Sequence, residues 1–552
     1  MAERRPLMLR YVRWILGNTA GIRLNLVMQV VLGLLNVACA LLMVWLSKMF
    51  IDETIQTGDD IEIIYVIAWL AAVVVAGILL RQTYYYLSVK AKVRQGNGIR
   101  LRIFNRLMHR QLFGNEQLHS AEIVSRLEQD IDKTSDSIST MLPEAVIGVC
   151  KLLGAFLLLR TMDTTLAWML LLLTPAFIIL GKFLARRLRT LTHDIRSQES
   201  KIQTIIQESL ELDTTLRTLG ATPWMVGKVD GLQDDLEAKV NRRSRFTVIT
   251  RSMLAAAFGL GYLVAFVWGG LQLRNGAITI GVMTSFLQLV GQIQQPILSL
   301  LNLVPQFIHA TASIDRLDEL DHLALEGDGN FTIDASATLI PKPNIKFSNV
   351  AFRYSDSGDV VFDNFNREIR FGSHTAIVGR TGTGKTTIFR MLLGLLKPTA
   401  GSVTLYNDEN EIPITPNTRP YFVFVPQGNT LMSGTIRYNL CLANPDASDA
   451  QLIDVLHIAM ADFVMELPEG LDTKVGERGG GLSEGQAQRI AIARGILRNG
   501  SVMLLDEISS ALDEDTEREL FKRLFERCKD KTILMITHRL AVADLCDEVW
   551  RM

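Results

Sequence analysis

Long uncharged stretches run through the first 315 residues of the chain. The stretch from Leu24 to Ser47, between Arg23 and Lys48, contains no charged residue, and several later stretches share this pattern. A helix needs about 20 predominantly apolar residues to cross the hydrocarbon core of a bilayer. We therefore predict six membrane-spanning helices, at about 24–47, 63–80, 142–160, 164–184, 252–273 and 277–305.

Two other interpretations of these stretches are weaker. A large soluble protein can bury one such helix, but a series of them within 315 residues is not typical of a soluble core. A signal peptide would have a shorter apolar region followed by small residues. The first stretch instead starts at about residue 24 and leads to Trp45, Lys48 and Phe50. The pattern therefore favours a helical domain in a lipid bilayer.

The charges between the stretches predict the orientation. Arginines crowd the N-terminal end, whereas the loop IDETIQTGDDIE is acidic, and segments 81–140 and 182–250 are rich in Lys and Arg. Basic loops favour the cytoplasmic side. We expect both chain ends and both basic segments to be cytoplasmic, with short outer loops near Asp163 and Asn275. The predicted location is the plasma (inner) membrane, crossed several times.

The two basic segments have apolar residues at helical spacing, as at Ile99, Ile103, Leu107 and Leu112. They are predicted to extend the spanning helices beyond the membrane and to turn back near 113–122 and 219–226, where GN and GATP interrupt the pattern. Such hairpins can touch a soluble domain. The alternative is a pair of solvated helical loops, and the basic faces alone do not decide between the two.

The pattern changes after residue 320. The stretch EGDGNFTIDASATLIPKPN lacks periodicity and is typical of a linker. Short apolar runs such as TAIVG, YFVFV, SVMLL and TILMI then alternate with helical segments, which predicts strands of a mostly parallel sheet. We assign a transmembrane domain to 1–320, a linker to 321–343, and an α/β domain with a helical subdomain to 344–552.

Composition excludes some functions. With 57 basic and 58 acidic residues the net charge is −1, so no global charge favours nucleic acid. Hydrophobic residues make up 48%, which excludes a disordered chain. The five cysteines have neither metal-ligand nor redox spacing, so a zinc site or a disulfide framework is not expected.

A phosphate-binding loop is the first chemical motif of the α/β domain. GRTGTGKTT follows the strand-like run TAIV and opens the helical segment KTTIFRMLLGLL. Its glycines let backbone N–H groups approach a phosphate, Lys385 would reach the β- and γ-phosphates, and the Thr386 hydroxyl would bind Mg²⁺. The loop candidates are Gly379, Arg380, Thr381, Gly382, Thr383, Gly384, Lys385, Thr386 and Thr387.

An apolar strand ending in two acids forms the second motif, SVMLLDE. Asp506 fits the Mg²⁺-holding position of a Walker B strand. Glu507 beside it can act as the general base for the attacking water. Acids at a strand end are common, but together with the upstream P-loop they predict an ATP-hydrolysing site.

The segment LSEGQ, from Leu482 to Gln486, lies between these motifs and opens a helical segment. On these residues the chain resembles the ATP-binding cassette transporters, as an exporter-type half transporter with six spans fused to one nucleotide-binding domain. The resemblance covers essentially the whole chain. It implies that Ser483, Gly485 and Gln486 bind the γ-phosphate held by the P-loop of the other subunit. Glu484 stands where the family usually has Gly.

The resemblance implies further roles at matching positions. Tyr354 resembles the aromatic residue that stacks on adenine, and Gln427 the glutamine that contacts Mg²⁺ and water. Asp513 in SSALD resembles the acid at the dimer interface, and His538 in MITHRL the switch histidine at the γ-phosphate. The family's sheet usually continues with a hairpin and a helical tail beyond the segment CDEVWRM, and we expect this sheet edge to lack that cover.

The resemblance implies an ATP- and Mg²⁺-dependent exporter that works by alternating access in a homodimer or heterodimer, with turns 113–122 and 219–226 as coupling helices. One alternative is a membrane subunit that binds ATP as a regulator or channel without pumping. Glu507 and His538 argue against it, because a sensor needs no hydrolytic base. A soluble cassette ATPase acting on ribosomes or DNA does not fit six spans and neutral charge.

Clues to the substrate are few. Gln288, Gln292 and Gln295 share one helical face and either line a pathway or bond to neighbouring helices. Lys151 is a charge inside the third span, and Glu144 on the same face is a candidate partner for it.

Overall fold

A computed structural model of the chain describes residues 11, 14–15, 17–55, 60–111, 120–326, 340–354, 360–476, 479–509 and 512–552. The chain divides into two compact units. The helical unit comprises Met1–Phe104 and His119–Asp321, and the sheet unit comprises Asn105–Leu118 and His322–Met552. The predicted linker at 321–343 and the predicted turn at 113–122 lie mostly outside the described residues.

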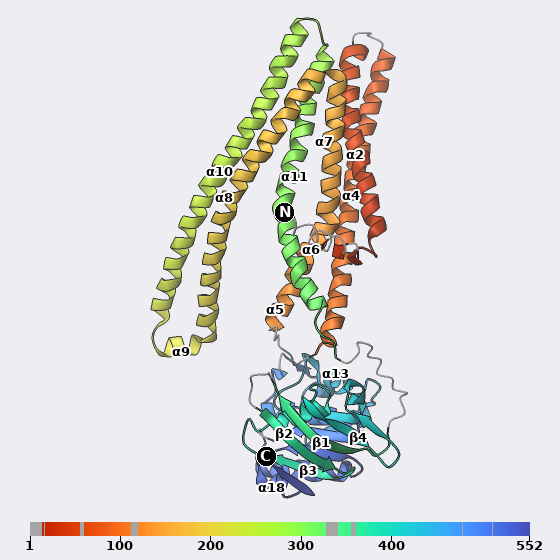
Figure 1. Cartoon of the computed structure of the whole chain (residues 1–552), viewed down its shortest axis with the longest axis vertical. Helices are drawn as coiled ribbons and strands as arrows, with labels where there is room; N and C mark the ends of the chain where they lie inside the picture. The colour runs from red at the N-terminus through yellow and green to blue at the C-terminus, as the bar shows by residue number, and fades with distance from the viewer. Residues whose placement is uncertain are drawn as a thin grey trace. The chain divides into compact units, whose positions relative to one another are not determined.

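Long helices build the helical unit (Figure 1). They are α2 (Arg23–Met49), α4 (Asp60–Met108), α7 (Leu142–Met162), α8 (Thr164–Glu211), α10 (Thr222–Arg274) and α11 (Ile280–Asp321), with the short helices α5 (Ser120–Ser125), α6 (Ile131–Asp136) and α9 (Asp213–Thr218). Of the helices searched, those holding α2, α4, α7, α10 and α11 are long and apolar enough to cross a membrane. The predicted fourth span falls in α8, where side chains 170–186 lie outside the described set.

The helical unit exposes many large apolar side chains. Leu24 is 75% exposed, Ile64 66% and Trp69 62%. Side chains of this size are rarely left in water in such numbers, whereas bilayer hydrocarbon solvates them. Small residues let the helices approach: a side-chain carbon at Gly33 of α2 would lie 2.1 Å from Ile147 of α7. Close helix contacts at small residues are typical of membrane helices.

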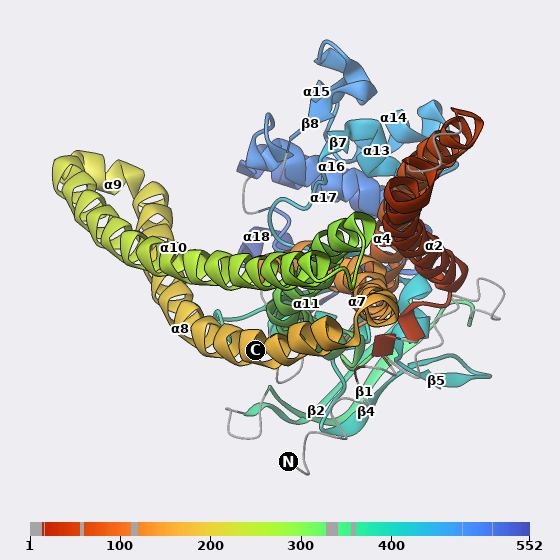
Figure 2. The same cartoon turned by 90° about the horizontal axis from the view of Figure 1, so that it is seen from above.

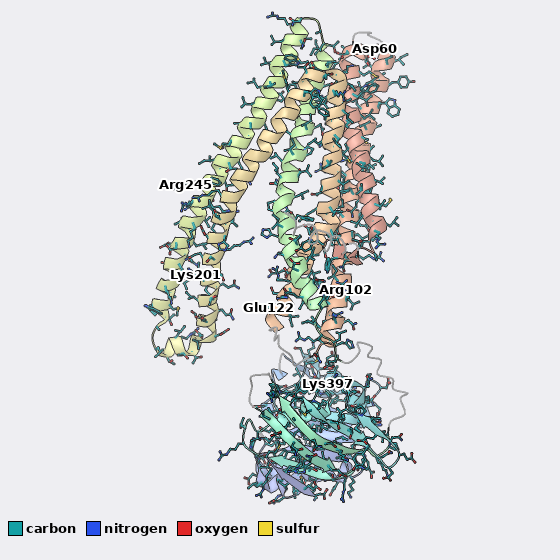
Figure 3. All side chains as sticks on the ribbon, viewed as in Figure 1. Asp60, Arg102, Glu122, Lys201, Arg245 and Lys397 are labelled. Atoms are coloured by element: carbon teal, nitrogen blue, oxygen red, sulfur yellow. The ribbon has the colours of Figure 1, made fainter. Side chains whose placement is uncertain are left out.

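Helices α8 and α10 run side by side and form a long hairpin that diverges from the other helices of the unit (Figures 1 and 2). The chain turns after α9, where Gly220 has φ +64. This confirms a turn at the start of the predicted segment 219–226, whereas Thr222 already begins α10. Charged side chains such as Lys201 and Arg245 mark the half of the hairpin nearer this turn (Figure 3). At the turn itself Leu219 is 73% exposed and Trp224 65%.

Two main sheets build the sheet unit. One has the strand order β11-β3-β10-β9-β6, all parallel, and the other has the antiparallel order β2-β1-β4-β5. The strands are β1 (Asn344–Arg353), β2 (Val360–Ile369), β3 (His374–Val378), β4 (Ala400–Tyr406), β5 (Glu411–Pro413), β6 (Phe422–Val425), β9 (Val502–Asp506), β10 (Thr532–Ile536) and β11 (Glu548–Arg551), and β7 (Gly434–Thr435) pairs with β8 (Lys474–Val475).

Helices cover the parallel sheet and complete the unit. They are α12 (Lys385–Leu392), α13 (Ile436–Cys441), α14 (Asp449–Ile458), α15 (Phe463–Glu466), α16 (Glu484–Leu497), α17 (Glu514–Arg527) and α18 (Leu540–Ala543). The fully buried strands β9 and β10 carry only apolar residues until each reaches its end, apart from Thr532 at the start of β10. Buried parallel strands require such runs because both faces of the sheet are covered.

One edge of the parallel sheet collects the chemical residues. Strands β3, β6, β9 and β10 end at Val378, Val425, Asp506 and Ile536. The carboxyl ends of parallel strands meet at the same edge, which is where α/β folds bind ligands. The residues that follow each strand end are therefore neighbours, although the sequence separates them by up to about 160 residues.

Candidate nucleotide site

The P-loop lies between β3 and the N-terminus of α12. Gly382 has φ +90 and Gly384 has φ +95, a backbone region that side chains rarely adopt. The Lys385 side chain folds back over the loop, and its Nζ donates to the carbonyl oxygens of Gly379 (2.7 Å) and Arg380 (2.9 Å). The Thr383 hydroxyl donates to the Arg380 carbonyl at 2.9 Å. The lysine is buried, yet within the described residues no carboxylate pairs with it.

Asp506 ends β9 beside the P-loop and is buried. The Thr386 hydroxyl donates a hydrogen bond to its carboxylate. Burial, and then the negative charge of Glu507, raise the pKa of Asp506 above its ordinary value. The ionised carboxylate is therefore unfavourable by itself, and a cation beside it would relieve that cost.

Glu507 is held in a strained conformation between two polar partners. Its φ is +48, in the left-handed region, and its N–H donates to the Ile536 carbonyl at 3.0 Å. Its Oε1 lies 2.9 Å from His538 Nε2, and its Oε2 accepts from Gln427 Nε2 at 2.9 Å. The three predicted catalytic residues are thus in contact, although they follow three different strands.

Tyr354 reaches the P-loop helix from the end of β1. Its hydroxyl lies 2.9 Å from the Thr387 hydroxyl and accepts from Arg390 at 3.0 Å, and its ring packs edge-on against Phe352. The ring is about half exposed, which leaves a face for an adenine base. Arg390 was missed from the sequence. Its signal was a cation on the predicted P-loop helix, and its positive charge also lowers the pKa of Asp506.

The signature segment lies apart from this cluster. Ser483 caps α16: its hydroxyl accepts from the Gln486 N–H at 3.2 Å, and the Gln486 side chain accepts from the Ser483 N–H at 2.9 Å. In the described part of the chain no hydrogen bond or ion pair joins Ser483, Gly485 or Gln486 to the P-loop, and Glu484 is exposed at the first turn of α16.

Asp513 also caps a helix. Its carboxylate accepts from the Thr516 N–H at 2.9 Å and from the Thr516 hydroxyl at 2.8 Å, and these bonds lower its pKa. Nearby, Arg539 fixes the start of α17 by donating to Glu517 and to the Leu512 carbonyl. Arg539 follows His538 directly, so this contact connects the histidine loop with the Asp513 segment.

The residues fit a magnesium nucleotide. The ammonium of Lys385 carries three N–H bonds and uses two of them in the loop, which leaves one for a phosphate. The N-terminus of α12 and the loop amides provide further donors. The Thr386 hydroxyl, the Asp506 carboxylate and the Gln427 amide are the oxygen ligands that Mg²⁺ prefers. The described residues contain no group of three His, Cys, Asp or Glu that could hold a metal by itself.

Comparison with known proteins identifies the family of both units. A family model for the ABC transporter transmembrane region matches residues 26–297, and a family model described as ABC transporter matches residues 362–510. The alpha-hemolysin translocation ATP-binding protein of Escherichia coli O157:H7 is 28% identical over 500 residues, which cover 90% of this chain and 69% of that protein. The leukotoxin export ATP-binding protein of Aggregatibacter actinomycetemcomitans is 28% identical over 91% of this chain and 70% of its own length.

The fold has a solved counterpart as well. The structure of a bacterial Atm1-family ABC exporter with ATP bound superposes with a TM-score of 0.80, covering 97% of this chain and 94% of that one at 22% identity. The two family models together match most of the chain, in the order that the two units have along the sequence. The chain belongs to the ATP-binding cassette transporter family, with a helical membrane region and a nucleotide-binding ATPase domain in one polypeptide.

Proposed function

We propose that the chain is an ATP-driven exporter that acts as a dimer. One observation carries the proposal: Gln427, Glu507 and His538 converge beside Lys385 and Asp506 at one edge of the parallel sheet. The named relatives translocate or export toxins, and export is the direction we assign here. The partner is a second copy of this chain or a related half transporter.

In this proposal each residue of the cluster has a separate task. Lys385 and the loop amides bind the β- and γ-phosphates of ATP, and the Tyr354 ring stacks on adenine. Glu507 accepts the proton of the attacking water, because each of its oxygens keeps a free lone pair beside its hydrogen bond to His538 or Gln427. Thr386, Asp506 and Gln427 would hold Mg²⁺, which neutralises charge on the phosphates when bound.

The proposal of a dimer rests on the signature segment, which among the described residues makes no hydrogen bond or ion pair with the P-loop of its own chain. Ser483, with Gly485 and Gln486, forms a helix N-terminus suited to phosphate, yet its hydroxyl bonds within its own helix. We propose that it faces the γ-phosphate on the partner's P-loop, with Asp513 at the same interface. The exposed Leu219 and Trp224 at the α8–α10 turn would pack on a nucleotide-binding domain as a coupling element.

The membrane placement completes the proposal. The chain is a membrane protein. We assign its ATPase domain to the cytoplasmic side of the plasma (inner) membrane, because basic loops favour that side. A regulatory or channel-like subunit is the second candidate. The contacts that Glu507 makes with His538 and Gln427 favour hydrolysis over sensing, because binding ATP alone requires no positioned base.

Hydrolysis by the purified chain in lipid nanodiscs tests the proposal. We expect Mg²⁺-dependent ATP turnover that falls by at least about 100-fold in Glu507→Gln, while nucleotide binding persists. The exposed Glu526→Gln on α17 is the matched control and is expected to keep its turnover. Turnover in Glu507→Gln equal to the wild type would refute the catalytic assignment. ATP binding without turnover by the wild type would favour a different partner subunit.

A further inference from the structure

A cavity of about 310 Å³ lies among four membrane helices of the helical unit. Asn36 of α2, Arg81 and Tyr84 of α4, Glu144 and Lys151 of α7 and Gln295 of α11 line it. Its volume is at the lower end of small-molecule sites. Three of the lining side chains are ionisable and oppositely charged, which is costly within a membrane domain and typical of a ligand pathway.

The three charged side chains do not neutralise one another. Among the described residues no ion pair or hydrogen bond involves Arg81, Glu144 or Lys151. The pairing of Glu144 with Lys151 that the sequence suggested is therefore wrong. Their seven-residue separation is about 10 Å of helix rise, which is beyond a direct contact unless both side chains converge. Each of the three side chains therefore lines the cavity without a salt-bridge or hydrogen-bond partner among the described residues.

Neutral groups around the cavity are unsatisfied as well. The Tyr84 hydroxyl is buried and has no hydrogen-bond partner among the described residues. On α11, near Gln295 but outside the residues that line the cavity, the Gln292 Oε1 is also buried without a hydrogen-bond partner among the described residues. Polar residues that bind helices to each other would be bonded across the helices, and these are not. Unsatisfied buried groups indicate something that is meant to meet them.

We propose that this cavity binds a small zwitterion and defines the substrate class of the exporter. The net charge of the three ionisable residues is +1, so an anionic group meets Arg81 and Lys151 while a cationic group meets Glu144. The separation of Glu144 and Lys151 along α7 fits a ligand whose two charges lie several bonds apart, as in a dipeptide or an ethanolamine phosphate headgroup. This inference rests on the proposed transport function.

Binding and ATPase stimulation are measured together on the full chain in nanodiscs. The probes are glycyl-phenylalanine, its N-acetylated anion and its methyl-ester cation, with Glu144→Gln, Lys151→Met and the control Arg160→Gln, which lies on the same helix outside the cavity. Phosphatidylethanolamine retained on the detergent-purified protein is counted by native mass spectrometry against a neutral glycolipid, which separates a free zwitterion from a lipid headgroup.

The two variants are expected to affect the binding of the probes differently. Lys151→Met weakens the binding of the zwitterion, whether dipeptide or ethanolamine lipid, and of the acetylated anion by about tenfold. Glu144→Gln weakens the binding of the zwitterions by a similar factor but leaves the binding of the acetylated anion unchanged. Arg160→Gln changes none of them. The proposal would be overturned if both variants changed the binding of all probes equally, or if the control changed it as much. It would also be overturned if a wild type that hydrolyses ATP bound no zwitterion. A wild type that binds ATP without hydrolysing it would instead concern the proposed function, because it would favour a different partner subunit, and zwitterion binding to that protein would still test the cavity.

Discussion

The two halves of a cassette nucleotide site are held in different ways in this chain. Lys385 is anchored on its own loop at 2.7 and 2.9 Å, and Glu507 is fixed by Gln427 and His538 at 2.9 Å each. Ser483 forms the cap of its own helix, with hydrogen bonds of 2.9 and 3.2 Å to Gln486. The proposed catalytic contacts therefore lie within one chain, whereas among the described residues the signature segment makes no hydrogen bond or ion pair with the P-loop. In the proposed dimer, hydrolysis requires the signature segment of a second chain.

The largest expected effect comes from replacing the lysine of the P-loop. Lys385→Ala deletes the one buried cation of the P-loop, so we expect ATP hydrolysis to fall by at least about 100-fold and nucleotide affinity to fall with it. The measurement is turnover in nanodiscs beside binding of a fluorescent ATP analogue. Lys397→Ala, an exposed lysine beyond α12 (Figure 3), is the control and is expected to change neither quantity.

A mixed dimer tests whether the two halves come from different chains. Lys385→Ala and Ser483→Arg are placed either on separate chains of one dimer or together on one chain beside a wild-type chain. If the halves meet between chains, the separated arrangement keeps one intact site and about half of the activity, whereas the combined arrangement damages both sites. Two affinity tags isolate each mixed dimer, and turnover per dimer is compared. The reverse ranking would place both halves in one chain.

The same contrast shows what the sequence can predict. The P-loop, the acids of SVMLLDE and the signature are local patterns, and each occupies the element expected for it. The contact between Gln427 and Glu507 spans 80 residues, so only parallel strand order or a family resemblance could anticipate it. The φ of +48 at Glu507 has no sequence signal, because glutamate does not favour that region.

In the membrane region the sequence predicts helices better than their partners. The stripe Ile99, Ile103 and Leu107 is buried, as helical spacing indicated. The same periodicity continues into Asn105–Leu118, which belongs to the sheet unit, where the Gln111 N–H donates to the Ala324 carbonyl at 2.9 Å. Periodicity gives the face of a helix but not the unit that covers it. That choice depends on long-range packing, which no local pattern encodes.

A smaller effect concerns the unfavourable charge of Asp506 in the folded protein. Burial and the neighbouring Glu507 charge raise the pKa of Asp506, so the ionised carboxylate destabilises the folded protein at a pH above this raised pKa. Asp506→Asn should therefore stabilise the nucleotide-free protein by about 1 kcal/mol while abolishing Mg²⁺-dependent turnover. Thermal unfolding measures the first effect. The gain should shrink as the pH falls toward the raised pKa, because the wild-type carboxyl then becomes neutral. A destabilised variant would show that the bond from Thr386 outweighs the charge cost.

The smallest expected effect concerns Glu484 in the signature segment. Glu484 is exposed at the start of α16, where an acid stabilises the helix dipole by about 0.5 kcal/mol and would oppose the phosphate of a partner-bound ATP. Glu484→Gln removes the charge and keeps the side chain, so the ATP concentration for half-maximal turnover should fall by about two- to threefold. Glu484→Gly should give the same fall with a lower unfolding temperature, because glycine weakens a helix. Turnover against ATP concentration at low and high salt measures the charge effect, which salt should reduce. If the two variants lower the half-maximal ATP concentration only at low salt, the repulsion between Glu484 and the phosphate acts through solvent. This result is expected if the N-terminus of α16 meets the phosphate only when two chains close. An unchanged value at low salt would mean that Glu484 points away from the phosphate in the closed dimer.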